Sequence, residues 1–483
     1  MASLEELRTS RQTKLERLRT LGKETYPAKV VRDFTLGEVV KKFTELEGKS
    51  VNLVGRVMAL RGQGGLIFID FTDGTGSLQA MLKRGETPDA EFDLFAETVD
   101  LGDFVALTGE LFTAKRGEKT ILVKSWQMAT KALLPLPEKW HGLQDAEERY
   151  RLRYLDLLMN PELRATFERK AKFWDTARAY LKNRDFLEVE TPSLELTTGG
   201  AEARPFKTHH HDFDLDVYLR ISVGELWQKR LMAAGIPRTF EIGRVFRNEG
   251  TSPEHLQEFT NLEFYAAYLD FTDGKKLIRD LYLTLAQEVF GKTKFEHKGH
   301  NFDLASDWPD LDYVSTIEQM TSMNVLTSSE NDLMKKLQEL GVEYTGKTRE
   351  RLADSLWKHC RKQIAGPAFL VNHPKFVAPL SKAKEDNSDL TYTTQIIIAG
   401  TEIGRAHAEL NDPLDQRARF EAQAKLIERG DEEAMMPDFE FVEMLEHGMP
   451  PTFGFGCGER LFATLEGKPI RETQLFPLLR PKN

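Results

Sequence analysis

The stretch FEIGRVFRNEGTSPEHLQEFTNLE, residues 240–263, decides the fold class of this chain. Apolar residues alternate with polar ones at its two ends, and a polar segment with Gly250 and Pro253 separates them. This pattern predicts an antiparallel hairpin with a long charged tip. The planar guanidinium of Arg247 suits phosphate oxygens, and the ring of Phe259 offers a flat face to a purine. The hairpin therefore indicates a site for a nucleoside triphosphate.

Composition bounds the class of protein. The chain has 483 residues, 40% of them hydrophobic and 29% charged, which is ordinary for a globular protein of two or three domains. No apolar run approaches the roughly 20 residues that span a bilayer, and the first residues lack the apolar core of a signal peptide. Cys360 and Cys457 have no metal or disulfide spacing. We therefore expect a cytoplasmic protein without a membrane segment.

Residues 1–49 are expected to form an N-terminal helical arm. Leucines recur at helical spacing among charged residues near the start of the chain. Two interpretations stay open: an amphipathic helix that packs on its own protein, which the leucine spacing favours, and a basic arm for RNA. Because the net charge is −10, contact with nucleic acid would need a local basic face. The residues that support the basic arm are Arg8, Arg11, Lys14, Arg17 and Arg19.

Residues 50–135 are expected to form an OB-fold barrel. Five short apolar runs, broken by glycines, follow one another in this segment. Such barrels bind oligonucleotides by stacking bases on aromatic side chains, and Phe68 is the candidate platform. A core position for Phe68 also stays open, because Ile67 and Ile69 flank it and one face of the strand must be buried.

The rest of the chain is expected to form a larger domain at residues 160–483, joined to the barrel by a linker at 136–159. A helix is expected at 161–183, and a largely helical insertion at about 272–390. Strands that come together across long insertions predict a mixed, mainly antiparallel sheet flanked by helices, and not regular βαβ winding. The fold class is therefore α+β, with an N-terminal OB-fold barrel.

Two further segments carry polar residues in patterns that suit a binding site. The glycine-rich run PTFGFGCGERLFATL, residues 451–465, lets backbone and ligand approach closely before Arg460 begins a helix. In TEIGRAHAELND, residues 401–412, a strand would place Arg405, His407 and Glu409 on one face. Glu225 is a second acid, distant in sequence. Two acids in one pocket would recognise a cationic side chain, whereas surface positions for both acids stay open on spacing alone.

Taken together, these segments resemble the class II lysyl-tRNA synthetases over nearly the full chain. The helix at 161–183 with the strand that ends before Pro192 is similar to their motif 1, residues 240–263 to motif 2, and residues 451–465 to motif 3. Other lysyl-like stretches are YRLRYLDLL (150–158), GGAEARPF (199–206), ELNDPLDQ (409–416), GDEEAM (430–435) and LFPLLRP (475–481).

The resemblance implies roles for individual residues. Arg247 and Arg460 would be the catalytic residues. The ATP site would consist of Arg247, Glu249, His255, Phe259, Glu402 and Arg460, and Glu402 would also bind the Mg²⁺ that accompanies ATP. The lysine site would consist of Gly200, Glu225, Arg247, Glu263, Tyr265, Arg405, His407 and Glu409. The anticodon of tRNA(Lys) would be read by Arg61, Phe68, Gln79 and Glu118. A homodimer through residues 161–192 is also implied.

Four positions depart from the family pattern. Gln395 stands where the family has a second metal-binding glutamate, and Arg405 replaces an asparagine that touches the substrate carboxylate. An arginine can bind a carboxylate bidentately, but it also adds a cation to a pocket for a cation. His407 replaces an aromatic residue that lines the lysine chain, and Glu459 replaces an aspartate.

The implied reaction is the ATP-dependent attachment of lysine to tRNA through a lysyl-adenylate, with catalysis by positioning and charge stabilisation. The alternatives are a class II synthetase for aspartate or asparagine, a paralogue that lysylates another protein, and a non-catalytic RNA-binding paralogue. Glu225 and Glu409 oppose the first, the expected barrel opposes the second, and the intact set of Arg247, Phe259, Glu263 and Arg460 opposes the third.

Overall fold

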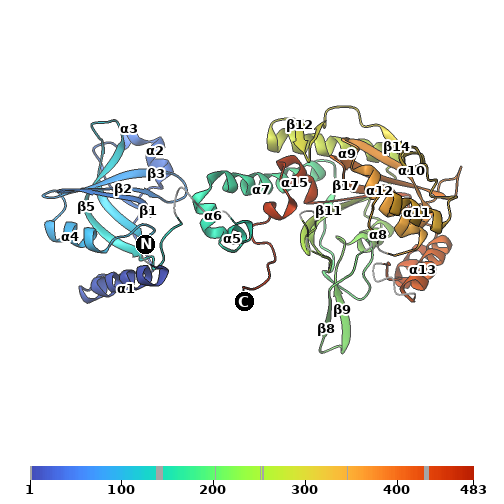
Figure 1. Cartoon of the computed structure of the whole chain (residues 1–483), viewed down its shortest axis with the longest axis horizontal. Helices are drawn as coiled ribbons and strands as arrows, with labels where there is room; N and C mark the ends of the chain where they lie inside the picture. The colour runs from blue at the N-terminus through green and yellow to red at the C-terminus, as the bar shows by residue number, and fades with distance from the viewer. Residues whose placement is uncertain are drawn as a thin grey trace. The chain divides into compact units, whose positions relative to one another are not determined.

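The protein consists of two compact units, Met1–Asp145 and Ala146–Asn483, which Figure 1 shows in a computed structural model. The structure describes residues 3–137, 145–201, 203–250, 252, 255–344, 346–428 and 434–482. Among these residues, no helix is both long and apolar enough to cross a membrane.

The first unit is built around a closed five-stranded barrel with the strand order β1-β2-β3-β5-β4. Burial alternates along β2, so that Ile67, Ile69 and Phe71 point into the barrel core. This alternation and closure confirm the OB-fold that the sequence predicts. The elements are β1 (Ser50–Gln63), β2 (Leu66–Thr72), β3 (Ser77–Lys83), α4 (Asp89–Thr98), β4 (Phe104–Thr113) and β5 (Lys119–Thr130).

The N-terminal arm packs on this barrel. It contains α1 (Leu4–Thr20), α2 (Leu36–Lys41) and α3 (Phe43–Leu46). A capping box of Ser3 and Glu6 begins α1, and Leu18 lies in the barrel core. Arg11 is buried and donates to the carbonyl oxygens of Leu101, Ala132 and Leu134 at 3.0–3.1 Å. The packed helix is therefore the better supported of the two interpretations of this arm.

The segment expected as a linker, 136–159, is helical in the part that follows residue 145. It forms α5 (Ala146–Arg151) and α6 (Arg153–Met159), which belong to the second unit. Arg153 is buried there and donates to the carbonyl oxygens of Gln474 and Leu475, both at 3.1 Å. These contacts place the start of the second unit before residue 160. Residues 138–144 of the expected linker lie outside the described residues.

The second unit has an eight-stranded sheet with the order β14-β15-β16-β17-β18-β11-β10-β6. The two outermost pairs, β14 with β15 and β10 with β6, are parallel, and the other pairs are antiparallel. The sheet is therefore mixed and mainly antiparallel, as predicted. The strands are β6 (Leu187–Glu188), β10 (Arg238–Phe246), β11 (Glu258–Ala267), β14 (Asp310–Asp312), β15 (Ala368–Pro374), β16 (Leu390–Ile398), β17 (Thr401–Ala408) and β18 (Thr452–Gly458).

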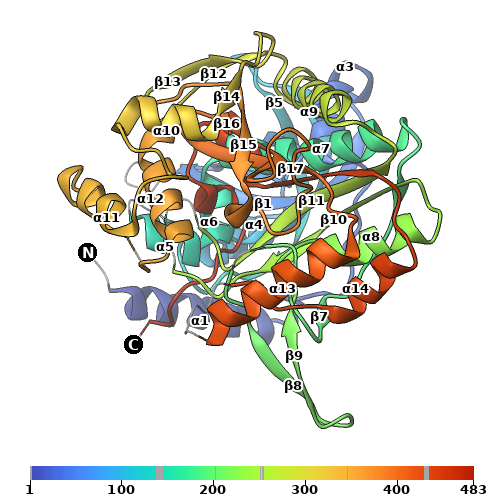
Figure 2. The same ribbon diagram turned by 90° about the vertical axis from the view of Figure 1, so that its right-hand side faces the viewer.

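Helices cover both faces of this sheet (Figure 2). On one face lie α7 (Pro161–Lys182), α9 (Phe271–Leu285), the π-helical turn η1 (Ala286–Phe290) and α15 (Arg460–Glu466). They pack on inward residues such as Phe264 and Phe455 to form the main core. On the other face lie α8 (Glu225–Ala233), α13 (Pro413–Glu428) and α14 (Phe439–Glu446). They pack around Tyr265 and Phe420 at one side of that face, next to the polar floor of the candidate site.

The segment expected as an insertion is only partly helical. Besides α9 and η1, its helices are α10 (Tyr313–Thr321), α11 (Glu330–Glu339) and α12 (Arg349–Arg361), which enclose Ile317, Leu337 and Trp357. It also contributes β14 and β15 to the edge of the large sheet, and a hairpin of β12 (Lys294–His297) and β13 (His300–Asp303). The remaining elements are a sheet of β7 (Leu194–Glu195), β9 (Leu215–Leu219) and β8 (Lys207–His210), and the 3-10 turns η2 (Lys375–Val377) and η3 (Ile470–Thr473).

Candidate active site

A row of polar positions crosses the centre of the large sheet. Gln395, Arg405, Gly456, Glu263 and Glu241 are consecutive partners on β16, β17, β18, β11 and β10. Directly paired residues point to the same face of a sheet. Five strands from three separate stretches of the chain therefore present one polar strip, with Gly456 in its middle, on the face opposite the main core.

A second row on the same face lies beside the first. His407 on β17 pairs with Gly454 on β18, which pairs with Tyr265 on β11. Because side chains alternate along a strand, His407 shares its face with Arg405, and Tyr265 shares its face with Glu263. The sequence predicted the common face of Arg405 and His407. The strand register adds that these two residues lie across β18 from Glu263 and Tyr265 on the hairpin strand β11.

The glycines of β18 leave the middle of this floor open. A Cβ atom on Gly454 would lie 2.0 Å from Glu409 Oε1 and 2.5 Å from Tyr265 Cε1. A Cβ atom on Gly456 would lie 3.2 Å from Glu263 Cγ. Glycines at these positions therefore keep the carboxylates of Glu263 and Glu409 accessible from the floor, as we expected of the glycine-rich run.

The two acids predicted to bind a cation, Glu225 and Glu409, lie together and bracket one ammonium group. That group belongs to the protein: Lys229 Nζ lies 2.7 Å from Glu225 Oε1 and 2.6 Å from Glu409 Oε2. Lys229 follows Glu225 by one turn of α8. Lys229 is not among the residues predicted for the site, although its spacing of four residues from Glu225 on a helix is a signal for such a pair.

The second oxygen of each acid faces the glycines around the pocket. Glu409 Oε1 lies against Gly454, as described above, and Glu225 Oε2 lies 2.7 Å from the position of a Cβ atom on Gly200. Gly200 has a φ angle of +86°, which favours glycine. Gly200 and Glu225, both predicted for the lysine site, are therefore in close contact.

Burial controls the charge of these groups. It raises the pKa of Glu409 to about 8 despite the attraction of Lys229, and it raises the pKa of Glu263 to about 7, helped by the nearby charge of Glu225. Burial alone would lower the pKa of Lys229, but the two carboxylates outweigh it and raise that pKa. Burial and then the charge of Arg405 lower the pKa of His407 well below its usual range, so this ring is neutral beside the acids.

Hydrogen bonds fix the carboxylate of Glu263. Its Oε1 accepts from the backbone N of Val223 and from Asn261 Nδ2, both at 2.8 Å, and its Oε2 accepts from the hydroxyl of Tyr265 at 3.0 Å. Val223 lies in the segment before α8. These bonds therefore join the hairpin strand β11 to the segment that presents Glu225.

Arg247 follows the first strand of the hairpin. Its Nε and Nη2 both lie 3.3 Å from the carbonyl oxygen of Ile221, and its Cζ lies 5.3 Å from the ring centre of Phe259. Burial lowers the pKa of Arg247, against the attraction of Glu249, Glu263 and Glu402. The structure thus brings the two principal residues predicted for ATP into contact.

The hairpin tip is described in part. The carbonyl oxygen of Glu249 accepts from Gln257 Nε2 at 3.4 Å, and the exposed His255 has its Nδ1 2.8 Å from Ser252 Oγ. Thr251, Pro253 and Glu254 lie outside the described residues.

Glu459, the departure within the third motif, has a structural role. It is buried, its Oε1 accepts from the backbone N of Thr260 at 2.6 Å, and its Oε2 lies 2.7 Å from Lys170 Nζ. It therefore links the start of α15 to the hairpin and to α7. The longer acid at this position keeps these contacts.

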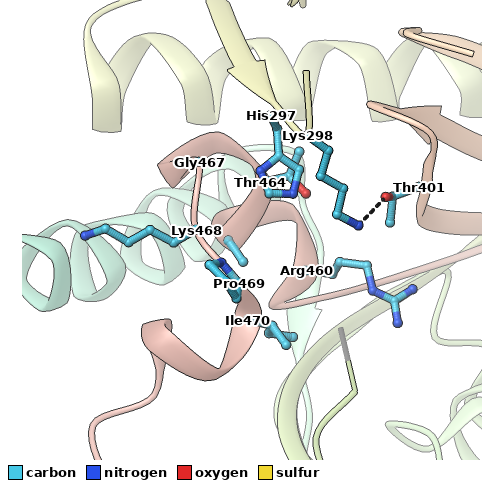
Figure 3. Close-up of a pocket in the computed structure, with 10 residues that line it drawn as sticks. His297, Lys298, Thr401, Arg460, Thr464, Gly467, Lys468, Pro469 and Ile470 are labelled. Carbon is cyan, nitrogen blue, oxygen red and sulfur yellow. Dashed lines mark hydrogen bonds between the residues drawn. The ribbon is translucent and has the colours of Figure 1, made fainter. Parts of the chain in front are cut away.

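Arg460 lies at a pocket of about 260 Å³ between the β12–β13 hairpin and α15 (Figure 3). Its Nη1 donates to the carbonyl oxygen of Glu402 at 3.1 Å, and Lys298 Nζ lies 3.3 Å from Thr401 Oγ1 on the same side. The pocket also borders His297 and Lys468, so basic side chains dominate its polar lining. This arrangement suits the phosphates of a nucleotide.

The residues at positions 395 and 402 do not fit a metal held by the protein. Glu402 Oε2 lies 3.5 Å from Arg361 Nη1, and Glu402 Oε1 lies 3.8 Å from Arg405 Nε. Gln395 is buried, and its Oε1 accepts from Trp357 Nε1 at 2.8 Å. Mg²⁺ prefers oxygen ligands, usually with one or two carboxylates. In the described part of the chain no cluster of three or more metal-binding residues occurs, and our expectation that Glu402 is a ligand gains no support.

On the barrel, three of the four residues predicted for the anticodon lie on one face of β1, β2 and β3, and the fourth, Glu118, immediately precedes β5. Arg61 pairs with Phe68, and Gln79 pairs with Asp70, which is two residues from Phe68. Gln79 Oε1 and the carbonyl oxygen of Glu118 lie 3.2 and 3.1 Å from the hydroxyl of Thr120. Phe68 is half-buried while its neighbours Ile67 and Ile69 are in the core, so its ring is on the outer face.

The fold is that of a class II tRNA synthetase with an OB-fold domain. The family model for tRNA synthetases class II (D, K and N) matches residues 145–480, and the model for an OB-fold nucleic acid binding domain matches residues 51–129. Proteins named lysine–tRNA ligase are similar over nearly the whole chain. The relative from Thermotoga maritima is 41% identical, with 99% of this chain and 97% of the relative covered. The relative from Carboxydothermus hydrogenoformans is 39% identical, with 99% of each covered. The chain therefore belongs to the lysine–tRNA ligase family of class II synthetases.

Proposed function

We propose that this protein attaches L-lysine to the 3′ end of tRNA(Lys) through a lysyl-adenylate formed from ATP. The observation that carries this proposal is the pair Glu225 and Glu409 beside the glycine floor. Each acid has one oxygen on Lys229 and a second that faces Gly200 or Gly454. These second oxygens are where the ammonium of a lysine side chain would be bound.

In the first step, the carboxylate of lysine attacks the α-phosphorus of ATP, and pyrophosphate leaves. Arg247 and Arg460 would hold the phosphates and stabilise the charge that develops, with Phe259 against the adenine and Glu249 and His255 near the nucleotide. Mg²⁺ that arrives with ATP supplies further charge neutralisation on phosphate oxygens. The α-amino group of lysine would contact Glu263 and the backbone of Gly200, with Tyr265 nearby.

In the second step, the terminal hydroxyl of tRNA attacks the carbonyl carbon of the adenylate, and AMP leaves. No protein nucleophile is needed, because catalysis rests on positioning. The outer face of the barrel, with Arg61, Phe68, Gln79 and Glu118, would bind the anticodon. We also propose that the protein forms a homodimer through residues 161–192. We propose a cytoplasmic location, because translation takes place there.

ATP–pyrophosphate exchange measured with each of the twenty amino acids tests the proposal. We expect exchange with lysine and at least tenfold less with aspartate or asparagine, because both acids of the pocket have the wrong sign for those side chains. Arg247→Ala is expected to abolish the exchange. Exchange with aspartate, or no exchange with any amino acid, would overturn the assignment, and the second outcome would favour a non-catalytic RNA-binding protein.

A further inference from the structure

Arg405 occupies the central row of the site, between Gln395 and Gly456. Its side chain is 37% exposed, and the nearest anionic group is Glu402, with 3.8 Å between Nε and Oε1. Among the described residues, no acceptor forms a hydrogen bond with this Nε. The guanidinium of Arg405 therefore forms a long ion pair with Glu402, and its N–H donors can still bind a ligand.

The surroundings of Arg405 form a site for an anion. Arg361 reaches the other oxygen of Glu402, and Arg460 donates to the backbone of that residue. Arg247 is close enough for Glu402 to influence its pKa. Two guanidinium groups, those of Arg361 and Arg405, thus lie at the carboxylate of Glu402, and two more are nearby. The four outnumber this carboxylate, which leaves an excess of positive charge where the triphosphate would lie.

Residue 395, where the family has a second metal-binding glutamate, is an uncharged glutamine whose side-chain oxygen already accepts a hydrogen bond. Gln395 is the cross-strand partner of Arg405, and its Oε1 accepts from the indole N–H of Trp357 at 2.8 Å. An amide there adds no charge to attract a dication, and Arg405 beside it repels one. Arg405 and Gln395 therefore both disfavour a bound metal ion, and Arg405 also favours a bound polyanion.

We propose that Arg405 binds the phosphates of ATP directly, so that the protein holds no metal ion of its own and binds ATP without one. The inference rests on the proposed function, because it concerns the same nucleotide site. The guanidinium would neutralise phosphate charge at the place where two carboxylates would otherwise hold Mg²⁺.

Isothermal titration calorimetry of ATP into the full chain tests this inference, once with EDTA and once with Mg²⁺. We expect the wild-type Kd with EDTA to lie within about threefold of the Kd with Mg²⁺. Arg405→Asn should weaken binding by about tenfold or more with EDTA, and by less than about threefold with Mg²⁺. Arg405→Lys, which keeps the charge, should restore binding with EDTA.

Arg417→Asn is the matched control, because Arg417 is an exposed arginine paired with Glu446. It should leave both Kd values unchanged. A loss of about tenfold in wild-type affinity on adding EDTA would overturn the inference, as would an equal loss for Arg405→Asn in both buffers. Circular dichroism of each variant establishes that it is folded, and the wild-type comparison between EDTA and Mg²⁺ carries the test if Arg405→Asn does not fold.

The double variant Gln395→Glu/Arg405→Asn supplies a second test, because it adds a carboxylate at position 395 to that of Glu402 and removes the guanidinium of Arg405. Titration with Mn²⁺ alone, followed by electron paramagnetic resonance, should show one bound ion per chain in the double variant and none in the wild type at the same concentration. Equal Mn²⁺ binding by both would overturn the inference. Lysine-dependent exchange by the wild type with MgATP, measured in parallel, separates the two proposals. Absence of this exchange refutes the proposed function. Exchange together with ATP binding that depends on metal refutes only the inference about Arg405.

Discussion

The ammonium of Lys229 lies 2.6 Å from a carboxylate oxygen of Glu409, and each of these side chains is 1% exposed. The same ammonium lies 2.7 Å from Glu225, which is also buried. One resident cation between two acids leaves a net charge of −1 when both acids are ionised. A single further ammonium, such as that of a lysine substrate, would complete the neutralisation. Lys229 thus sets the charge that the pocket can accept.

Lys229→Met is expected to lower the free energy of unfolding by about 3 kcal/mol, because it leaves two buried acids without a partner. Saturating L-lysine should then raise the melting temperature of the variant more than that of the wild type, because the ligand restores a missing cation. Differential scanning fluorimetry with and without lysine measures both effects. Lys358→Met, at an exposed lysine paired with Asp354, is the control and should change stability by less than about 0.5 kcal/mol. Equal melting temperatures for Lys229→Met and wild type would contradict this account.

Lysine binding should be coupled to proton release. The pKa of Glu409 is raised to about 8 by burial, so this acid is mostly protonated at neutral pH before ligand binds. A bound ammonium favours the ionised form and lowers that pKa. The Kd for lysine is therefore expected to fall several-fold as pH rises from about 6.5 to about 8. Calorimetry in two buffers with different ionisation enthalpies measures the released protons. Proton uptake, or a Kd that does not depend on pH, would be inconsistent with this pKa.

Much of this site could be predicted from the sequence because it depends on local periodicity. A period of two placed Arg405, His407 and Glu409 on one face, and the apolar alternation around residues 240–263 gave the hairpin. The partners that come from distant elements could not be found in this way. Arg361 reaches Glu402 from α12, within a segment whose sequence carries no nucleotide-binding pattern. Cross-strand register, which joins Gln395 to Arg405, is likewise a tertiary property.

The boundaries between the two units were the least predictable part of the fold. The prolines before residue 138 suggested a linker that continued to 159, but the segment from 146 onward folds into α5 and α6. The reason lies in Arg153, whose guanidinium bonds to carbonyl oxygens more than 300 residues away in the chain. These bonds cannot be read from the neighbours of Arg153 in sequence.

Glu195 should make stability depend on pH. It is buried, its Oε1 accepts from Trp227 Nε1 at 3.0 Å, and burial raises its pKa to about 7. Since the folded-state pKa lies above the unfolded value, the stabilisation is complete below about pH 4.5 and is lost as pH rises through about 7. Glu195→Gln imitates the protonated acid. Between about pH 4 and pH 8, we expect the free energy of unfolding of the wild type to fall by about 3 kcal/mol more than that of Glu195→Gln.

Urea denaturation at several pH values in this range measures the difference between Glu195→Gln and the wild type. Glu440→Gln, at an exposed position of α14, is the matched control and should follow the wild-type profile. Parallel pH profiles for Glu195→Gln and wild type would show that Glu195 does not titrate in this range.

Phe68→Ala should separate the two steps of the proposed reaction. The ring lies on the outer face of the barrel opposite Arg61, and stacking of one base on an aromatic ring contributes about 1–3 kcal/mol. We therefore expect kcat/KM for tRNA to fall about tenfold or more, while lysine-dependent ATP–pyrophosphate exchange is unchanged. Tyr26→Ala is the matched control, because Tyr26 is an exposed aromatic residue of the same unit. It should alter neither rate by more than about threefold. A loss of exchange in Phe68→Ala would mean that the ring supports the fold and not the recognition of tRNA, because exchange requires only lysine and ATP.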